Sequence, residues 1–311
     1  MKYMLSLTFL LLFYCNSFAQ VNTNYIDSLS STMLNIRDEL VTIKENYYVI
    51  MPYGIAGNIG VYTGKDQIIL VDDQWSILSS RIKEILKMVS DKPVKYIVNT
   101  HFHYDHTNGN KSFGKENIPI IAHANVRERL SKDQELSAPY SILQKGYALE
   151  ALPSITFTDS LQVHDGVEII ELIHCKNAHT DGDAIVHFKK ANIYHTGDIF
   201  VTYGLPYIDE NNGGDIYGII AAVDYLLAAA NPQTKFIPGH GPVCSITELA
   251  DYRKLLVSIK DQVSGFMKKG FTLEKIMSEV KIDEKIQGVG RKDFIAHVYR
   301  MVLQHEKISH K

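Results

Sequence analysis

The chain has 311 residues, of which 45% are hydrophobic and 22% charged, a composition that excludes a fibrous or wholly disordered protein. Its formal net charge is -3, with 32 lysines and arginines against 35 aspartates and glutamates. Binding to nucleic acid needs a concentrated cationic surface, so this balance argues against nucleic acid as a partner and favours a small-molecule substrate.

Residues 1–19 have the pattern of an export signal. Lys2 supplies a positive start, residues 4–14 form a short apolar run, and Ala19 ends a small-residue cleavage motif. The apolar run is well short of the ~20 residues that a membrane-spanning helix needs. We therefore expect cleavage after Ala19, no membrane span, and a mature protein that is periplasmic or secreted. Lipidation at Cys15 is the alternative, which the bulky residues before it disfavour.

Strand and helix patterns alternate along the rest of the chain. The N-terminal half predicts strands at 49–53, 59–62, 67–73, 96–100 and 118–122 and helices at 76–89 and 124–130. The C-terminal half predicts strands at 155–163, 167–173, 184–188, 192–196 and 235–238 and helices at 215–230, 246–269, 273–279 and 292–305. Residues 131–153 are irregular and predict a surface insertion. Since strands and helices are mixed throughout and neither forms a separate block, we expect one layered α/β domain over residues 20–311.

Cys175 and Cys244 remain after removal of the predicted signal. An oxidising compartment permits them to pair, and each stands four residues from a candidate metal ligand. Two buried free thiols are nevertheless the favoured interpretation.

A dense group of metal-binding side chains follows the strand predicted at 96–100. The stretch His101-Phe102-His103-Tyr104-Asp105-His106 holds three imidazoles and one carboxylate. Alternation in an extended segment puts His101 and His103 on the same side, where both can reach one ion. Imidazole and carboxylate without thiolate suit zinc and, less exclusively, iron or manganese.

Three further candidate ligands stand at the ends of predicted strands. His179 lies in the polar turn Ala178-His179-Thr180, and Asp198 follows the strand at 192–196. His240 lies in Pro238-Gly239-His240-Gly241, where the glycines allow the backbone to come close to a metal.

Over residues 101–242 the motifs follow the order HxHxDH, AHT, GD and PGHG. This ordered set resembles the metallo-β-lactamase superfamily. The resemblance implies an α/β fold, a four-layer αββα sandwich of two mixed β-sheets with the metal site at one edge. It also implies two zinc ions per chain. The first would be held by His101, His103 and His179 and the second by Asp105, His106 and His240, with Asp198 and a hydroxide as bridges.

The implied activity is hydrolysis of an ester, lactone or amide by attack of the bridging hydroxide on the carbonyl carbon. Two zinc ions ~4 Å apart lower the pKa of a bound water, polarise the carbonyl and stabilise the leaving group. Asp105 is the expected catalytic residue, because its carboxylate can orient the hydroxide or pass a proton to the leaving group.

A β-lactamase that opens the ring of antibiotics is the alternative within the same chemistry. Export favours it, since such antibiotics are met outside the cytoplasm. Asp198 argues against it, because a bridging aspartate resembles the glyoxalase-II-like and lactonase members. Three more distant alternatives are disfavoured. His103 argues against a flavodiiron oxidoreductase, and the complete set of ligands argues against a non-enzymatic protein. The charge balance argues against a nuclease.

Other side chains are expected around the ligands. Asp72 or Asp73, with Asp72 favoured, is expected to brace a ligand loop from a strand end. Aromatic residues that are candidates for walls around the substrate are Trp75, Tyr104, Tyr203 and Tyr207.

Overall fold

The computed structural model describes residues 37–52 and 56–309. The predicted signal at 1–19, with Cys15 in it, lies outside the described residues, so cleavage and lipidation stay predictions. Among the described helices, none is long and apolar enough to cross a membrane.

The first half of the described chain forms a seven-stranded mixed sheet in the order β1-β2-β3-β4-β5-β6-β9. Its first four strands pair antiparallel, and from β4 onward the pairs are parallel. The strands are β1 (Asp38–Lys44), β2 (Tyr47–Pro52), β3 (Ile59–Thr63), β4 (Ile68–Val71), β5 (Val94–Val98), β6 (Ile120–His123) and β9 (Ile155–Phe157).

The second half forms a five-stranded sheet in the order β10-β11-β12-β13-β14, with only the last pair parallel. Its strands are β10 (Ser160–Asp165), β11 (Glu168–His174), β12 (Ala184–Phe188), β13 (Ile193–His195) and β14 (Lys235–Ile237).

The single strand predicted at 155–163 is wrong, because Thr158 and Asp159 carry the chain from one sheet to the other. The Thr158 carbonyl accepts a hydrogen bond from the His123 side chain, and the Asp159 carbonyl accepts one from the His174 backbone. These two bonds hold the link to the end of β6 in the first sheet and to the end of β11 in the second. Sequence alternation alone cannot show which sheet a strand joins.

The two sheets pack face to face through alternate side chains of their strands. In β4, Ile69 and Val71 point into the layer between the sheets, where they meet Leu172 and Val186 of the second sheet. Ile68 and Leu70 point to the opposite face, toward a helix. This period of two is the pattern of strands buried on both faces.

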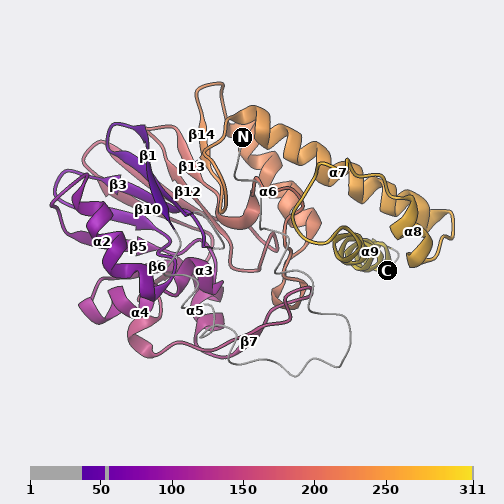
Figure 1. Cartoon of the computed structure of the whole chain (residues 1–311), viewed down its shortest axis with the longest axis horizontal. Helices are drawn as coiled ribbons and strands as arrows, with labels where there is room; N and C mark the ends of the chain where they lie inside the picture. The colour runs from indigo at the N-terminus through magenta and orange to yellow at the C-terminus, as the bar shows by residue number, and fades with distance from the viewer. Residues whose placement is uncertain (1–36, 53–55, 310–311) are drawn as a thin grey trace, which may run out of the picture.

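Helices cover the outer face of each sheet, which completes the predicted αββα sandwich (Figure 1). On the first sheet, α2 (Ser79–Lys87) buries Ile82 and Leu86. The predicted helix at 76–89 begins as the 3-10 turn η1 (Ser76–Leu78). The second sheet is covered by a larger helical layer, formed by α6 (Ile216–Ala229), α7 (Ile246–Lys268), α8 (Leu273–Glu279) and α9 (Arg291–Ser309).

Residues 131–153 are not a simple surface insertion. They contain a short hairpin of β7 (Gln134–Glu135) and β8 (Leu143–Gln144) and the turn η3 (Leu149–Ala151). Leu136 and Ile142 are buried in a cluster with Phe102 and with α5 (Ala124–Leu130). The segment therefore packs against the histidine-rich stretch. Cys175 and Cys244 are buried free thiols, as the sequence favoured.

Candidate metal centre

The predicted ligands gather at one edge of the sandwich, where strands from both sheets end. His101 and His103 follow β5, and His106 lies in the short helix α3 (Tyr104–Thr107). His179 lies in the loop between β11 and β12. Asp198 and His240 follow β13 and β14, whose parallel pairing brings their ends together.

The donor atoms form three overlapping groups, each with all its atoms within 4.8 Å of one another. These groups are His101 with His103 and His179, His101 with His106 and Asp198, and Asp105 with His106 and His240. Every ligand predicted from the sequence is therefore in the cluster, and the middle group joins the other two.

The hydrogen bonds around the imidazoles show that the donor set fits a metal. His103 Nε2 lies 2.9 Å from the Asp209 carboxylate, and His179 Nδ1 lies 2.9 Å from the Tyr207 carbonyl oxygen. Both outer nitrogens must therefore donate, which leaves the inner nitrogens of neutral rings with lone pairs. The inner nitrogens, His103 Nδ1 and His179 Nε2, are only 2.9 Å apart. Two lone pairs this close repel each other unless a proton or a metal cation lies between them.

His101 gives an independent indication, because its Nε2 is buried and has no hydrogen-bond partner within residues 37–52 and 56–309. A buried nitrogen without a partner is costly unless it binds an ion. Burial lowers the pKa of His101 well below its usual value and that of His179 to about 4, so both rings are neutral at pH 7, the form that binds metal. Burial opposes a charge on His240 too, but the carboxylates of Asp198 and Asp105 raise its pKa to about 9.

Asp72 braces the ligand loop, in agreement with the preference for it over Asp73. Its carboxylate accepts hydrogen bonds from Thr100 N, Thr100 Oγ1 and His106 Nδ1, each at 2.8 Å. The Asp72 backbone adopts a φ of +64°, a region that aspartate enters more readily than most residues. Asp73 is fully buried, and its carboxylate has no hydrogen-bond partner among the described residues.

Two other bracing carboxylates were missed by sequence reasoning. Asp209 binds His103 and also accepts hydrogen bonds from Ser137 N and Oγ and from Asn212 Nδ2. Asp183 accepts hydrogen bonds from the backbone of His179 and of the residue after it, which fixes that turn. The only signal for either was an acidic residue in a polar loop, and that signal is common to many loops.

Two glycines let the backbone approach the cluster closely. A Cβ on Gly239 would lie 1.9 Å from Asp198 Oδ1, which agrees with the role expected for the glycines beside His240. A Cβ on Gly57 would lie 2.2 Å from His106 Cε1. Gly57 was not singled out from the sequence, because its contact with His106 is purely tertiary.

The cluster is most open beside Asp105 and His240, whose side chains are 18% and 15% exposed. Tyr203 stands on this side, with its ring centroid 5.9 Å from that of His240. The expectation that Trp75 forms a wall is wrong, because Trp75 is 3% exposed and packs 4.9 Å from the Tyr104 ring in the core under α2.

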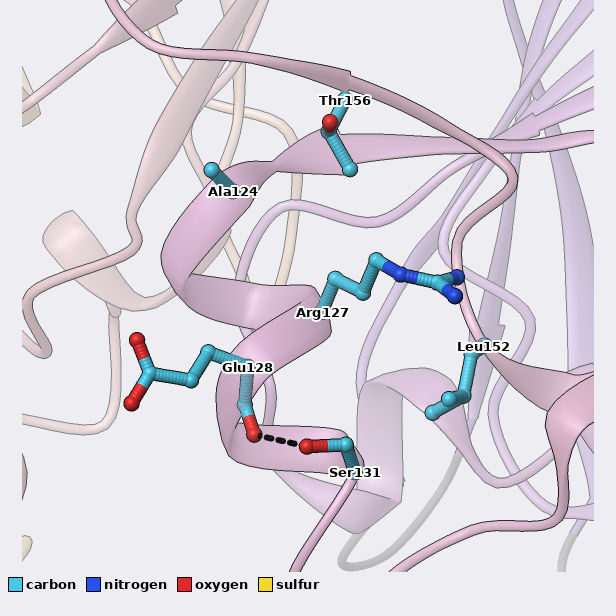
Figure 2. A pocket seen from close by; sticks show the side chains of 6 residues that line it. All are labelled: Ala124, Arg127, Glu128, Ser131, Leu152 and Thr156. Atoms are coloured by element: carbon cyan, nitrogen blue, oxygen red, sulfur yellow. Dashed lines mark hydrogen bonds between the residues drawn. The ribbon is translucent and has the colours of Figure 1, made fainter.

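A shallow pocket of about 300 Å³ lies away from the cluster, between α5 and β9 (Figure 2). It contains none of the predicted ligands. Arg127 in its wall is already bonded to the Pro153 carbonyl, and Glu128 pairs with Lys132 outside it. The reactive groups therefore lie in the metal cluster and not in this pocket.

Comparison with known proteins gives one family and one fold. Residues 53–251 match the model of the metallo-beta-lactamase superfamily. A linear primary-alkylsulfatase of a Pseudomonas species is 24% identical over 262 residues, which cover 71% of this chain and 49% of the relative. A probable metallo-hydrolase of Methanocaldococcus jannaschii is 27% identical over 195 residues, 61% of this chain and 90% of the relative. The chain thus spans about half of the length of the first relative.

Two solved structures superpose on most of this chain. The DIM-1 metallo-beta-lactamase superposes with a TM-score of 0.58 at 18% identity and covers 72% of this chain and 99% of its own. The sec-alkyl sulfatase PisA1, as a double mutant, gives a TM-score of 0.65 at 15% identity, over 85% of this chain and 50% of its own. At these identities the likeness shows the fold.

Proposed function

This chain belongs to the metallo-β-lactamase superfamily, and we propose that it is an exported, dinuclear zinc hydrolase that cleaves a carbonyl substrate, an ester, lactone or amide. The observation that carries the proposal is the complete set of donors. Three imidazoles form one end of the cluster, and Asp105, His106 and His240 form the other. Catalytic zinc sites accept a donor set of imidazole nitrogens and carboxylate oxygens without sulfur.

The two ends of the cluster support a division of ligands between two ions. His101, His103 and His179 would hold the first zinc, and Asp105, His106 and His240 the second, with Asp198 shared. When bound, the ions supply a Lewis acid and a water of lowered pKa. Asp198 is suited to the shared role because Oδ1 lies 3.2 Å from His106 Nε2 and Oδ2 lies 3.6 Å from His179 Nε2.

Asp105 is the residue that we assign to proton transfer. Its Oδ2 lies 3.2 Å from His240 Nε2, and it is the most exposed carboxylate of the cluster. There it can accept a hydrogen bond from the attacking water and pass the proton to the departing oxygen or nitrogen. The more deeply buried carboxylates, Asp72 and Asp209, hold histidines and do not face the substrate.

A hydrolysis panel tests the proposal. Purified protein with about two zincs per chain is expected to hydrolyse at least one of an aryl ester, a homoserine lactone, a thioester and a chromogenic cephalosporin. An alkyl sulfate belongs in the panel because of the alkylsulfatase relative. Asp105→Asn should lose most of this activity, whereas Glu128→Gln, remote from the cluster, should not. Rapid turnover of the cephalosporin alone would favour the β-lactamase alternative, and iron in place of zinc would refute the hydrolase.

Export is a separate part of the proposal and has its own test. It is supported by the charged start, apolar run and cleavage motif of residues 1–19. N-terminal sequencing of protein from the periplasm or medium should begin at Gln20. A mature protein that keeps Met1 would contradict export, whereas lipid on Cys15 would contradict cleavage after Ala19 and show an exported protein that is tethered to the membrane.

A further inference from the structure

Two tyrosines expose their rings beside the proposed metal centre. Tyr140 is 52% exposed and Tyr203 is 37% exposed. Single exposed aromatic residues are normal on protein surfaces. These two are different because Tyr203 packs against a predicted ligand and Tyr140 packs against Tyr207, whose carbonyl holds another. They also come from separate segments of the chain.

Tyr203 lies at the open side of the cluster. Its ring meets the His240 ring at 5.9 Å and an interplanar angle of 61°. His240 and Asp105 are the most exposed of the predicted ligands, so this is the side from which a substrate can reach them.

Tyr140 lies at the other end, over the three-histidine group. Its ring packs edge-on against the Tyr207 ring, with centroids 4.9 Å apart. The Tyr207 ring in turn lies 5.8 Å from the rings of both His103 and His179. Tyr140 and Tyr203 thus flank one continuous cluster from its two ends, because the donor groups that contain His103 and His240 are joined through the group of His101, His106 and Asp198.

The loop that carries Tyr140 is fixed at its base. Leu136 N donates to Ile142 O across the loop, at 2.9 Å, and both side chains are buried. Ser137 binds the same Asp209 carboxylate that holds His103, and its carbonyl accepts the Tyr207 hydroxyl. The position of the Tyr140 ring is therefore set relative to the metal ligands, which reduces the entropy lost when a substrate orders it.

We propose that Tyr140 and Tyr203 form an aromatic subsite that holds an aryl group of the substrate next to the scissile carbonyl. Aromatic rings attract each other at centroid distances of about 4.5–7 Å, edge-on or offset. Two such faces should favour an aryl ester over its methyl counterpart by about tenfold. The inference rests on the proposed hydrolytic function and assigns its substrate class.

The first test measures kcat/KM of the zinc-loaded protein for phenyl acetate, methyl benzoate and methyl acetate. Tyr203→Ala and Tyr140→Ala should each lower the aryl-to-methyl ratio severalfold, and the double variant by about tenfold. Tyr203→Phe and Tyr140→Phe should keep the ratio, because the ring and not the hydroxyl is required. Tyr225→Ala, a tyrosine on α6 that is 44% exposed, is the matched control and should change neither rate.

The second test separates this inference from the proposed function. Benzohydroxamic and acetohydroxamic acid both bind zinc through the same group, and their Kd values can be measured without turnover. The wild type should prefer the benzo compound, and the double variant should lose that preference at unchanged zinc content. If the esters are not hydrolysed but the preference exists, the carbonyl assignment fails and the subsite stands. If the alanine variants weaken both hydroxamates equally, or neither, the aromatic subsite is refuted.

Discussion

Replacing Asp209 by asparagine should weaken zinc binding through His103 with almost no change in volume. Asp209 Oδ1 accepts hydrogen bonds from Ser137 N and Oγ, and Oδ2 accepts them from His103 Nε2 and Asn212 Nδ2. A backbone N–H is always a donor, so the oxygen of the new side-chain amide would have to face Ser137. The NH2 group of that amide would then face two donors, His103 and Asn212.

His103 can avoid that clash only by moving its proton to Nδ1, the nitrogen that lies 2.9 Å from His179 Nε2 and would bind the proposed zinc. The opposite orientation of the amide leaves the buried Ser137 N–H without an acceptor, at a cost of about 1–3 kcal/mol. Either outcome corresponds to a loss of about 10–100-fold in zinc affinity, in line with other residues that hold metal-binding histidines.

Competition with a chromophoric zinc chelator measures this loss directly. Ser137→Ala is the matched control, because it removes one hydrogen bond to the same carboxylate and leaves the contact with His103; we expect it to change the affinity by less than about threefold. Wild-type affinity in Asp209→Asn, or an equal loss in both variants, would show that the contact with His103 does not control metal binding.

Three further outcomes follow from the structure. Gly57→Ala should displace His106, since the new Cβ would lie 2.2 Å from its ring, and zinc per chain measured by elemental analysis should fall toward one. Removing zinc with a chelator should lower the melting temperature, because a site at 100 times its Kd contributes about 2.7 kcal/mol; an unchanged melting curve would contradict metal binding by the folded state. Burial raises the pKa of Glu210, but His297 and Arg300 outweigh it and lower the pKa from 4.5 to about 2. The resulting stability, about 1–2 kcal/mol after allowance for solvent, is complete above pH 4.5 and lost as the pH falls toward 2. Urea unfolding at pH 7 and pH 2 should therefore show a smaller difference for Glu210→Gln than for the wild type.

The cluster of candidate ligands could be predicted from the sequence because its members lie in short motifs at strand ends. Periodicity located the strands, and the end of a buried strand is where a loop can present histidines to a site. His101 to His106 needed only local spacing, and His179, Asp198 and His240 needed only the order of the motifs. The resemblance to a family then supplied the sandwich.

The residues that hold the ligands could not be found in the same way. Asp209 meets His103, and Gly57 meets His106, only after the chain has folded. Trp75 follows a strand end, as Asp72 does, yet it turns into the core and not toward the site. Similarly, the burial of Leu136 inside an irregular segment depends on Phe102 as its partner. None of these contacts produces a periodic pattern of residues in the sequence.

The link at Thr158 and Asp159 divides the metal centre as well as the sheets. Every predicted ligand before the link follows β5, and every predicted ligand after it lies in a loop or turn that follows a strand of the second sheet. Neither half of the chain holds all the donors of the three-histidine group. The proposed zinc ions would therefore join the two halves as a cross-link does. A protein cut at this exposed link should become a pair of fragments whose association strengthens with zinc concentration.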